Sequence, residues 1–295
     1  MLCGPPLSTS KPVKVLIGIT TQNRAEILPK AIQSALEQDY VDKEIAVFDD
    51  ASTDETKDLR AGFPQVRWYR VEKTQGYLAA RNQMMSHTDA EFYFSLDDDA
   101  WFIKGDEISV GVKLLAEHTE VAALAYDILS PDRPDPCERT TPYKMHTYIG
   151  CGHLLRLSAA KELGYYTPNP GFYGSEEKDL CLRLLDRGYE IVYLPGVHVW
   201  HDKAMLARSL PAQHRSGVCN DFVFAFRRCP FPMVLWLLPG KVLSHLKFAL
   251  GNGFLGPCLA GMFLFLKSVR GLARTREPVS PLAFREFLRR SHIRS

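Results

Sequence analysis

Three consecutive carboxylates, Asp97, Asp98 and Asp99, follow directly after the apolar run 92–96. This run is rich in aromatic residues and predicts a buried strand. Ligands of open α/β sheets bind at the carboxyl ends of the strands, and clustered carboxylates there suit a hard divalent cation. Asp is also common in turns and at helix N-caps, so the same residues fit an acidic turn. The triplet therefore indicates either a metal site for a phosphate-bearing ligand or a capping turn.

Polar residues also end two other predicted strands. Asp49 and Asp50 follow the run 44–48, and a polar loop at 20–24 follows the run 13–19. Packing of an apolar sheet does not require acids at these positions, whereas a polyanionic ligand held through a metal would. Two of four predicted strand ends carry paired or tripled Asp, which favours the metal interpretation.

The elements that must position these acids alternate along the chain. Apolar runs at 13–19, 44–48, 66–71 and 92–96 alternate with helical patterns that begin near Glu26, after Ser52 and at Gly76. We expect an edge strand at 66–71, a helix at 105–124, a surface loop at 130–143, a strand after 149–152, a helix at 180–187 and a last strand at 191–194. This order predicts an α/β fold with a Rossmann-like, mainly parallel mixed sheet flanked by helices.

Composition limits the class of protein. A chain of 295 residues with 46% hydrophobic content can bury a full core. Its seven cysteines are odd in number and lack Cys-x-x-Cys pairs, so we expect free thiols in a reducing cytoplasm, without a disulfide framework or zinc site. Residues 1–12 lack the apolar segment of a signal peptide and are expected to be a flexible N-terminus.

The C-terminal quarter differs from the rest in charge. Residues 227–295 hold twelve Lys or Arg and two Glu, so this segment carries +10 and the remainder −8. Residues 248–266 contain no charged side chain, but Gly and Pro interrupt them. Basic residues beside apolar helices favour anionic lipid over nucleic acid. We therefore expect peripheral membrane contact through residues 230–276 and no nucleic-acid partner; helical packing against the rest of the chain is the alternative.

Five motifs occur in order at residues 15–24, 44–56, 76–82, 96–100 and 175–184. Each is weak alone, but the ordered set resembles the family 2 inverting glycosyltransferases of GT-A fold. The resemblance implies a nucleotide-diphosphate-sugar donor, Mg²⁺ or Mn²⁺, and inversion at the anomeric carbon. It also implies a catalytic domain over 13–210, with a nucleotide-sugar-binding half at 13–104 and an acceptor-side half at 105–210. Residues 211–295 would then form a helical, basic appendage.

The resemblance also implies roles for individual residues on the donor side. Gln22 lies in the first loop, where the family often has Tyr, so the stacking on the base that Tyr provides is not expected from this position. Arg81 matches a position near the diphosphate, although a solvated helix charge is the alternative. The donor-binding residues carried over in this way are Thr20, Gln22, Asn23, Arg24, Asp49, Asp50, Gly76, Arg81, Asn82, Asp97 and Asp98.

The same resemblance implies the metal ligands and the catalytic general base. Asp97–Asp99 match the Asp-x-Asp motif with a register ambiguous by one residue, and Asp99, Asp97 and His201 are the expected metal ligands. Inversion requires one carboxylate as general base. Glu177 is the expected base and Glu176 its alternate, although acids near a helix start are also favoured by the helix dipole.

The sequence thus predicts a metal-dependent, hexosyltransferase-like enzyme. It would move a sugar to a hydroxyl of a saccharide or lipid-linked saccharide, in cell-surface polysaccharide or glycolipid synthesis. The expected location is cytoplasmic, peripheral on the inner face of the cell membrane. The alternatives are a nucleotidyltransferase, for which the loop 20–24 lacks the Gly that cradles a triphosphate, and a non-catalytic sugar-nucleotide-binding or membrane scaffold.

Overall fold

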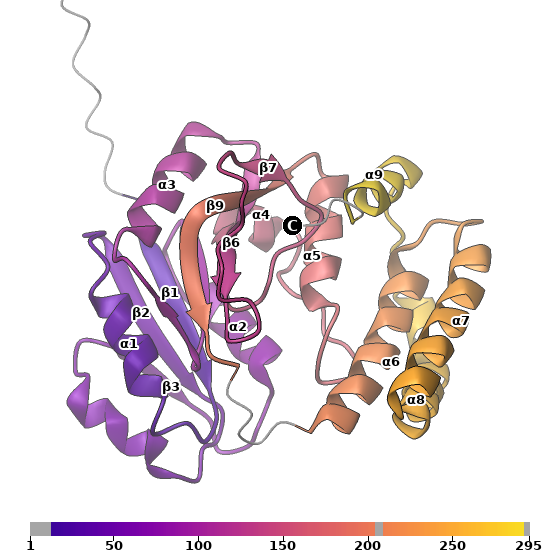
Figure 1. Cartoon of the computed structure of the whole chain (residues 1–295), viewed down its shortest axis with the longest axis horizontal. Helices are drawn as coiled ribbons and strands as arrows, with labels where there is room; N and C mark the ends of the chain where they lie inside the picture. The colour runs from indigo at the N-terminus through magenta and orange to yellow at the C-terminus, as the bar shows by residue number, and fades with distance from the viewer. Residues whose placement is uncertain (1–12, 204–208, 292–295) are drawn as a thin grey trace, which may run out of the picture.

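The computed structural model describes residues 13–203 and 209–291 (Figure 1), so the N-terminus predicted to be flexible lies outside the described residues. Within the described ranges, nine strands form one sheet with the order β3-β2-β1-β4-β8-β6-β9-β5, and β7 pairs with β9. The strands are β1 (Val15–Thr21), β2 (Lys43–Asp49), β3 (Arg67–Arg70), β4 (Phe92–Asp97), β5 (Ala100–Phe102), β6 (Val121–Leu129), β7 (Tyr143–Lys144), β8 (His153–Arg156) and β9 (Glu190–His201).

Helices connect these strands and continue the chain beyond the sheet. They are α1 (Leu28–Leu36), the 3₁₀ helix η1 (Glu55–Gly62), α2 (Tyr77–Ser86), α3 (Glu107–Glu117), α4 (Leu157–Glu162), α5 (Glu176–Asp186), α6 (Leu210–Arg228), α7 (Val234–Asn252), α8 (Leu255–Arg274) and α9 (Pro281–Ser291). The mixed α/β class and the C-terminal helical region agree with the prediction. β3 is the expected edge strand.

The first half of the sheet is parallel. β1 lies between β2 and β4, and its register places Thr20 beside Asp97 and Thr21 beside Asp49. Every residue of β1 is buried, because helices cover both faces of this central strand. α1 and α3 pack on one face, whereas α2, α4 and α5 pack on the other. The carboxyl ends of β1, β2 and β4 therefore meet at one edge.

The second half of the sheet mixes directions. β8 runs antiparallel to β4 and β6, and β9 runs parallel to β6 but antiparallel to β5. Opposite β6, the pairing of β9 jumps from Leu194 to His198, which leaves residues 195–197 as a bulge. Gly196 has φ 83 within it, a value that Gly adopts without a steric penalty.

Three predicted element bounds need correction. The helix expected over 105–124 ends at Glu117, and Val121 begins β6, which is buried at every position. A continuous apolar run fits a buried strand or a buried helix equally well by periodicity, so the pattern did not separate them. α5 starts at Glu176 rather than at residue 180, and β9 continues to His201 rather than ending at residue 194.

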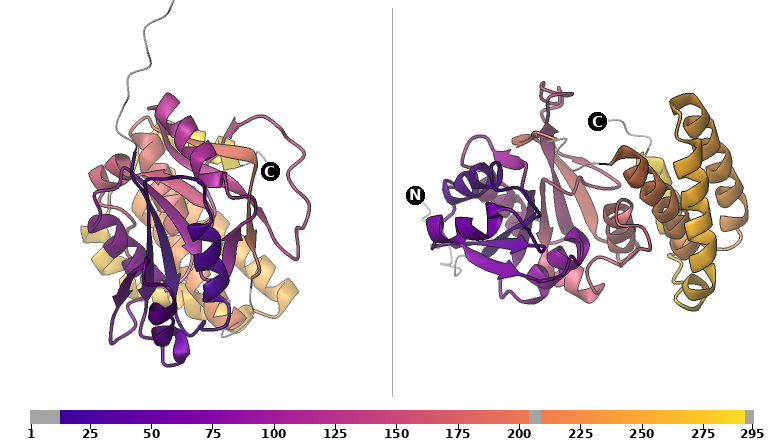
Figure 2. Two further views of the ribbon diagram at one scale, coloured as in Figure 1. Left: turned by 90° about the vertical axis from the view of Figure 1, so that its left-hand side faces the viewer. Right: turned by 90° about the horizontal axis from the view of Figure 1, so that it is seen from below.

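The C-terminal helices lie beside α5 on the side away from β1–β3 (Figure 1). α6 packs against α8 and α7, and the right-hand view of Figure 2 shows α7 and α8 side by side at that end of the molecule. The charge-free segment 248–266 spans two helices, because Gly253, with φ 72, ends α7. α8 is long and apolar enough to cross a membrane, and 22% of its apolar window is buried.

Candidate active site

Arg81 lies at the centre of the polar edge. It belongs to α2, whose start is held by Asp50: the carboxylate accepts hydrogen bonds from the backbone N–H groups of Gln75 (2.7 Å) and Gly76 (2.8 Å). The Arg81 side chain is 3% exposed and donates from Nη2 to Asp97 at 2.7 Å. Burial disfavours its charged form, but the combined attraction of neighbouring groups, Asp97 foremost and Glu177 among them, outweighs this cost, and the pKa of Arg81 lies well above its ordinary value. Arg81 is therefore a fixed positive charge.

Two acids begin α5 on the other side of Arg81. Oε1 of Glu177 lies 3.8 Å from Nη1 of Arg81, and the Tyr77 hydroxyl donates a hydrogen bond to Glu176. Burial and the neighbouring Glu176 raise the pKa of Glu177 above its ordinary value, against the opposing effect of Arg81. A carboxylate with a raised pKa is a stronger base than an exposed one, as proton abstraction requires.

Gly150 allows this close approach. A Cβ at this position would lie 2.6 Å from Oε1 of Glu177 and 3.0 Å from Nη1 of Arg81. The Gly150 carbonyl also accepts a hydrogen bond from Nη2 of Arg81 at 3.3 Å. A side chain at residue 150 would therefore displace the ends of the two charged side chains that lie against it.

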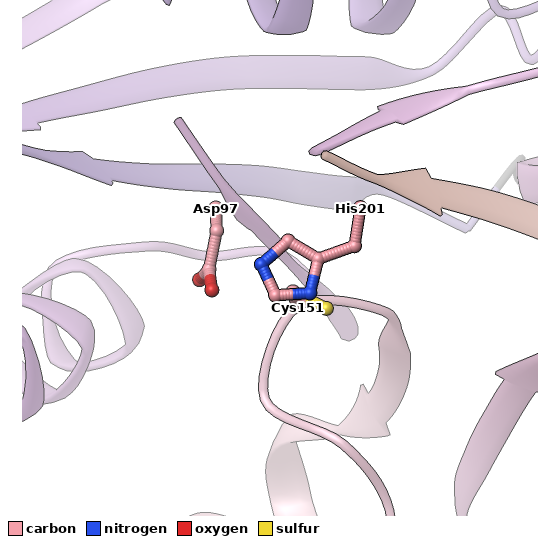
Figure 3. Close-up of side chains that lie close together, drawn as sticks. All are labelled: Asp97, Cys151 and His201. Carbon is pink, nitrogen blue, oxygen red and sulfur yellow. The ribbon is translucent and has the colours of Figure 1, made fainter. Parts of the chain in front are cut away.

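Acids and a histidine gather beside Arg81. β5 pairs Ala100 with His201, so Nε2 of His201 lies 3.2 Å from Oδ1 of Asp99. Among the described residues, ligand atoms of Asp97, Cys151 and His201 all lie within 4.8 Å of one another. Figure 3 shows these three side chains converging from separate segments. His198 lies instead at the opposite side of β9, with Nε2 3.5 Å from Asp127.

This group of side chains fits a divalent cation. Ligands at about 2.1 Å from an octahedral ion lie about 3.0 Å apart when adjacent and about 4.2 Å apart when opposite. The ligand atoms of Asp97, Cys151 and His201 lie within 4.8 Å of one another, so small movements would bring them to these separations. Burial and, to a smaller extent, the charges of Asp99 and Asp97 raise the pKa of Asp98 to about 7. Nearby positive charge would relieve this repulsion.

The remaining predicted donor residues divide into two groups. Thr20 lies beside Asp97 in the sheet, and Arg24 lies 3.8 Å from Asp98, so both adjoin the acids. The others hold the surrounding loops. Their side chains bond to neighbouring loop residues: Gln22 to Asp50 and Thr74, Asn23 to Thr53, Asp49 to Arg70 and Ser52, and Asn82 to both backbone groups of Tyr166.

Three residues of this edge were not singled out from the sequence. Tyr77 bonds to Glu176, Arg70 pairs with Asp49, and Cys151 joins the acid and histidine group. Tyr77 and Arg70 belong to a predicted helix and a predicted strand, and residues of these types are ordinary in such elements. Their presence therefore did not indicate a functional site. The Gly-Cys-Gly sequence at 150–152 was the one local signal, because small residues permit close approach of the backbone.

Comparison with known proteins finds similarity to one family. A sequence model described as Glycosyl transferase family 2 matches residues 16–134. The GalNAc(5)-diNAcBac-PP-undecaprenol beta-1,3-glucosyltransferase of Campylobacter jejuni is 33% identical over 97 residues, which cover 31% of this chain and 31% of that protein. The uncharacterized glycosyltransferase YwdF of Bacillus subtilis is 25% identical over 172 residues, which cover 52% of this chain and 62% of that protein. These matches span less than two thirds of either relative. Residues 16–134 of this chain therefore match glycosyl transferase family 2.

Solved structures establish the fold. The mannosyltransferase PcManGT from Pyrobaculum calidifontis, in complex with GDP-Man and Mn²⁺, aligns with a TM-score of 0.59 and 17% identity over 96% of this chain and 80% of that one. Residues 1–349 of S. aureus TarS, in complex with UDP-GlcNAc, align with a TM-score of 0.61 and 16% identity over 90% of this chain and 82% of that one. The predicted GT-A fold is confirmed.

Proposed function

We propose that this protein is a metal-dependent inverting glycosyltransferase that moves a sugar from a nucleotide-diphosphate-sugar donor to a hydroxyl of a saccharide or lipid-linked saccharide. The position of Arg81 carries the proposal: one buried guanidinium lies 2.7 Å from Asp97 and 3.8 Å from Glu177. A phosphate-binding charge, a cation-binding acid and a candidate base thus adjoin one another. The match of residues 16–134 to glycosyl transferase family 2 supports sugar transfer as the reaction.

The donor side has hydrogen-bond donors available for phosphate. Nε and Nη1 of Arg81 and Nη1 of Arg24 are buried without a hydrogen-bond partner among the described residues. Leaving buried N–H groups unpaired is costly, so an acceptor is expected when the site is in use. Diphosphate oxygens match the planar guanidinium in shape and charge.

Asp99, Asp97 and His201 are the residues we assign to the cation, Mg²⁺ or Mn²⁺. When bound, it would neutralise the charge that grows on the departing nucleoside diphosphate. Arg81 adds a second positive charge from the protein itself. Because Asp97 contacts Arg81 and also belongs to the group around His201, it links the diphosphate-binding charge to the cation-binding residues.

Glu177 is assigned as the general base. It would take the proton of the acceptor hydroxyl while that oxygen attacks the anomeric carbon from the face opposite the nucleotide. Gly150 and Tyr77 limit the movement of the acid pair, because Gly150 packs on Glu177 and Tyr77 bonds to Glu176. Holding the base in place lowers the entropy cost of reaching the reactive geometry.

A lipid-linked acceptor fits the outer face of α7 and α8. Large apolar side chains are exposed there: Leu235, Trp236, Leu243, Phe248 and Leu250 on α7, and Leu255, Leu259, Phe263 and Leu266 on α8. Between these helices and Phe222 lies an apolar hollow of about 570 Å³. Lys267, Arg270 and Arg274 follow on α8, and basic residues beside such a face favour an anionic bilayer surface.

We therefore infer peripheral binding to the inner face of the cell membrane, in synthesis of a cell-surface glycan or glycolipid. The Campylobacter jejuni relative is named for an acceptor carried on undecaprenol, which supports the lipid-linked class.

The test is a donor screen with purified protein. Nucleotide sugars are supplied one at a time with Mn²⁺ and extracted lipid acceptors, and release of nucleoside diphosphate is measured. We expect release with one donor, loss of release with a chelator, and loss in Asp99→Ala. Pyrophosphate release from a nucleoside triphosphate would instead indicate a nucleotidyltransferase, and donor binding without turnover under all conditions would indicate a scaffold.

A further inference from the structure

Strand pairing brings Cys151 to the acids. β4 and β8 are antiparallel with Ser95 opposite His153. Continuing this register by two residues in each direction places Asp97 opposite Cys151. His201 arrives independently, because β5 pairs Ala100 with it. Residues from three distant segments therefore meet at one point, as Figure 3 shows.

The glycines on either side fix the position of Cys151. A Cβ at residue 150 would meet Oε1 of Glu177 at 2.6 Å, and a Cβ at residue 152 would meet Cδ1 of Ile128 at 2.2 Å. The Gly152 carbonyl accepts a hydrogen bond from the backbone N–H of Tyr126 at 3.0 Å. The backbone is therefore closely packed on both sides of Cys151, which is itself only 1% exposed.

We propose that Cys151 is a sulfur ligand of the cation in this site, together with Asp97 and His201, and that it gives the site high affinity for thiophilic divalent ions. The inference rests on the cation site of the proposed function. Its geometric basis is that the three ligand atoms lie within 4.8 Å of one another. Carboxylate and imidazole accept many divalent ions, whereas thiolate selects softer ones such as Zn²⁺, Cd²⁺ and Co²⁺.

Charge balance is consistent with this set. When Sγ binds the cation, the S–H bond breaks, the proton passes to solvent, and the thiolate offsets one of the two positive charges of the ion. Asp97 can retain its bond to Arg81 through Oδ1 and offer the other oxygen. His201 contributes a neutral nitrogen. The thiolate therefore adds negative charge to a site that already contains the carboxylates of Asp97 and Asp99, which favours a divalent cation there.

Cobalt spectroscopy tests the sulfur ligand without measuring sugar transfer. Co²⁺ is added to wild type, Cys151→Ser and the matched control Cys258→Ser, whose thiol is also buried but lies on α8. We expect a near-ultraviolet sulfur-to-cobalt absorption band in wild type and Cys258→Ser, absent from Cys151→Ser. We also expect Co²⁺ affinity at least about tenfold weaker in Cys151→Ser, as loss of a metal ligand implies. An unchanged band in Cys151→Ser, or no band in wild type, overturns the proposal.

A second measurement does not depend on the folding of a variant. X-ray absorption at the cadmium edge of the wild-type protein with one equivalent of Cd²⁺ should show one sulfur neighbour among oxygen and nitrogen neighbours. A shell of oxygen and nitrogen alone overturns the assignment. Sulfur ligation in a protein that transfers no sugar would remove the proposed function and leave this inference standing. Sugar transfer without sulfur ligation would overturn this inference and leave the proposed function standing.

Discussion

The carboxylate of Glu177 lies 3.8 Å from the guanidinium of Arg81, at the start of α5 and within α2 respectively. The pair joins two helices that pack on the same face of the sheet. A base placed beside the charge that binds the diphosphate can act on an acceptor only when that acceptor lies close to the donor. The relationship makes Glu177 the most informative position to change.

Replacing Glu177 with Gln should remove the base while keeping the shape of the side chain. We expect kcat to fall about 10²–10⁴-fold, with donor affinity little changed because the amide still fits beside Arg81. Turnover and calorimetric donor binding are measured together. Glu162→Gln, on the half-exposed side chain that pairs with Arg187, is the control and should keep wild-type turnover. Full activity in Glu177→Gln with loss in Glu176→Gln would assign the base to Glu176.

The pH dependence of the reaction should report the environment of Glu177. Burial and Glu176 raise the pKa of Glu177 above the ordinary 4.5, and a base acts only when ionised. The kcat/KM value should therefore increase with pH along a limb centred above 4.5. Glu176→Gln removes the neighbouring negative charge, lowers the pKa of Glu177 and moves the limb to lower pH. A limb that stays in place or moves upward in this variant would contradict the assignment.

The link between α5 and α6 should be a major contributor to stability. Asp179 accepts hydrogen bonds from Nε of Arg228 at 2.6 Å and from Nε of Arg183 at 2.8 Å, and all three side chains are buried. Arg228→Ala leaves Asp179 with one partner fewer. We expect a loss of about 3 kcal/mol in the free energy of unfolding, the lower end for a broken buried ion pair because Arg183 remains.

Urea unfolding measures this loss. The control is Arg289→Ala, whose side chain is 69% exposed and pairs with Glu286; its effect should stay within about 0.5 kcal/mol. Equal effects of the two substitutions would show that the buried pair between α5 and α6 contributes no more than a surface pair.

Membrane binding should depend on the exposed face of α7 and α8. The double variant Trp236→Ser and Phe263→Ser removes two side chains that are 81% and 58% exposed. Because each buried aromatic contributes about 1.5–3 kcal/mol, we expect binding to anionic vesicles to weaken at least about tenfold. Vesicle sedimentation is the measurement, with Val41→Ser, at an exposed position remote in sequence, as the control. Wild-type protein that does not sediment with vesicles would exclude this contact.

Sequence patterns predicted the parts of the fold that depend on neighbouring residues of the chain. The strands that end at Asp49 and Asp97 follow from apolar runs interrupted by acids, and Gly76 and Gly188 lie at helix ends, both with positive φ. The placement of Arg81 on a helix after Gly76 was also confirmed. These features need only a few neighbouring residues to be recognised.

Long-range pairing produced the features that the sequence did not reveal. Cys151 reaches Asp97 only through the register of β4 with β8, and Arg228 reaches Asp179 across 49 positions of the chain. β6 was mistaken for the end of a helix because both faces of this strand are covered, which removes the alternation that marks a half-exposed strand. Contacts of this kind are properties of the assembled sheet and helices.

The bulge in β9 determines which histidine lies beside the acids. Leu194 and His198 face consecutive residues of β6 although they are four positions apart. Side chains alternate along a strand, so the length of segment 195–197 determines which face of the sheet each later side chain of β9 lies on. A one-residue deletion there that left the earlier pairing intact would shift the strand by one place and turn His201 away from Asp99. The spacing of this segment, more than the identity of its residues, is thus what keeps an imidazole at the acids.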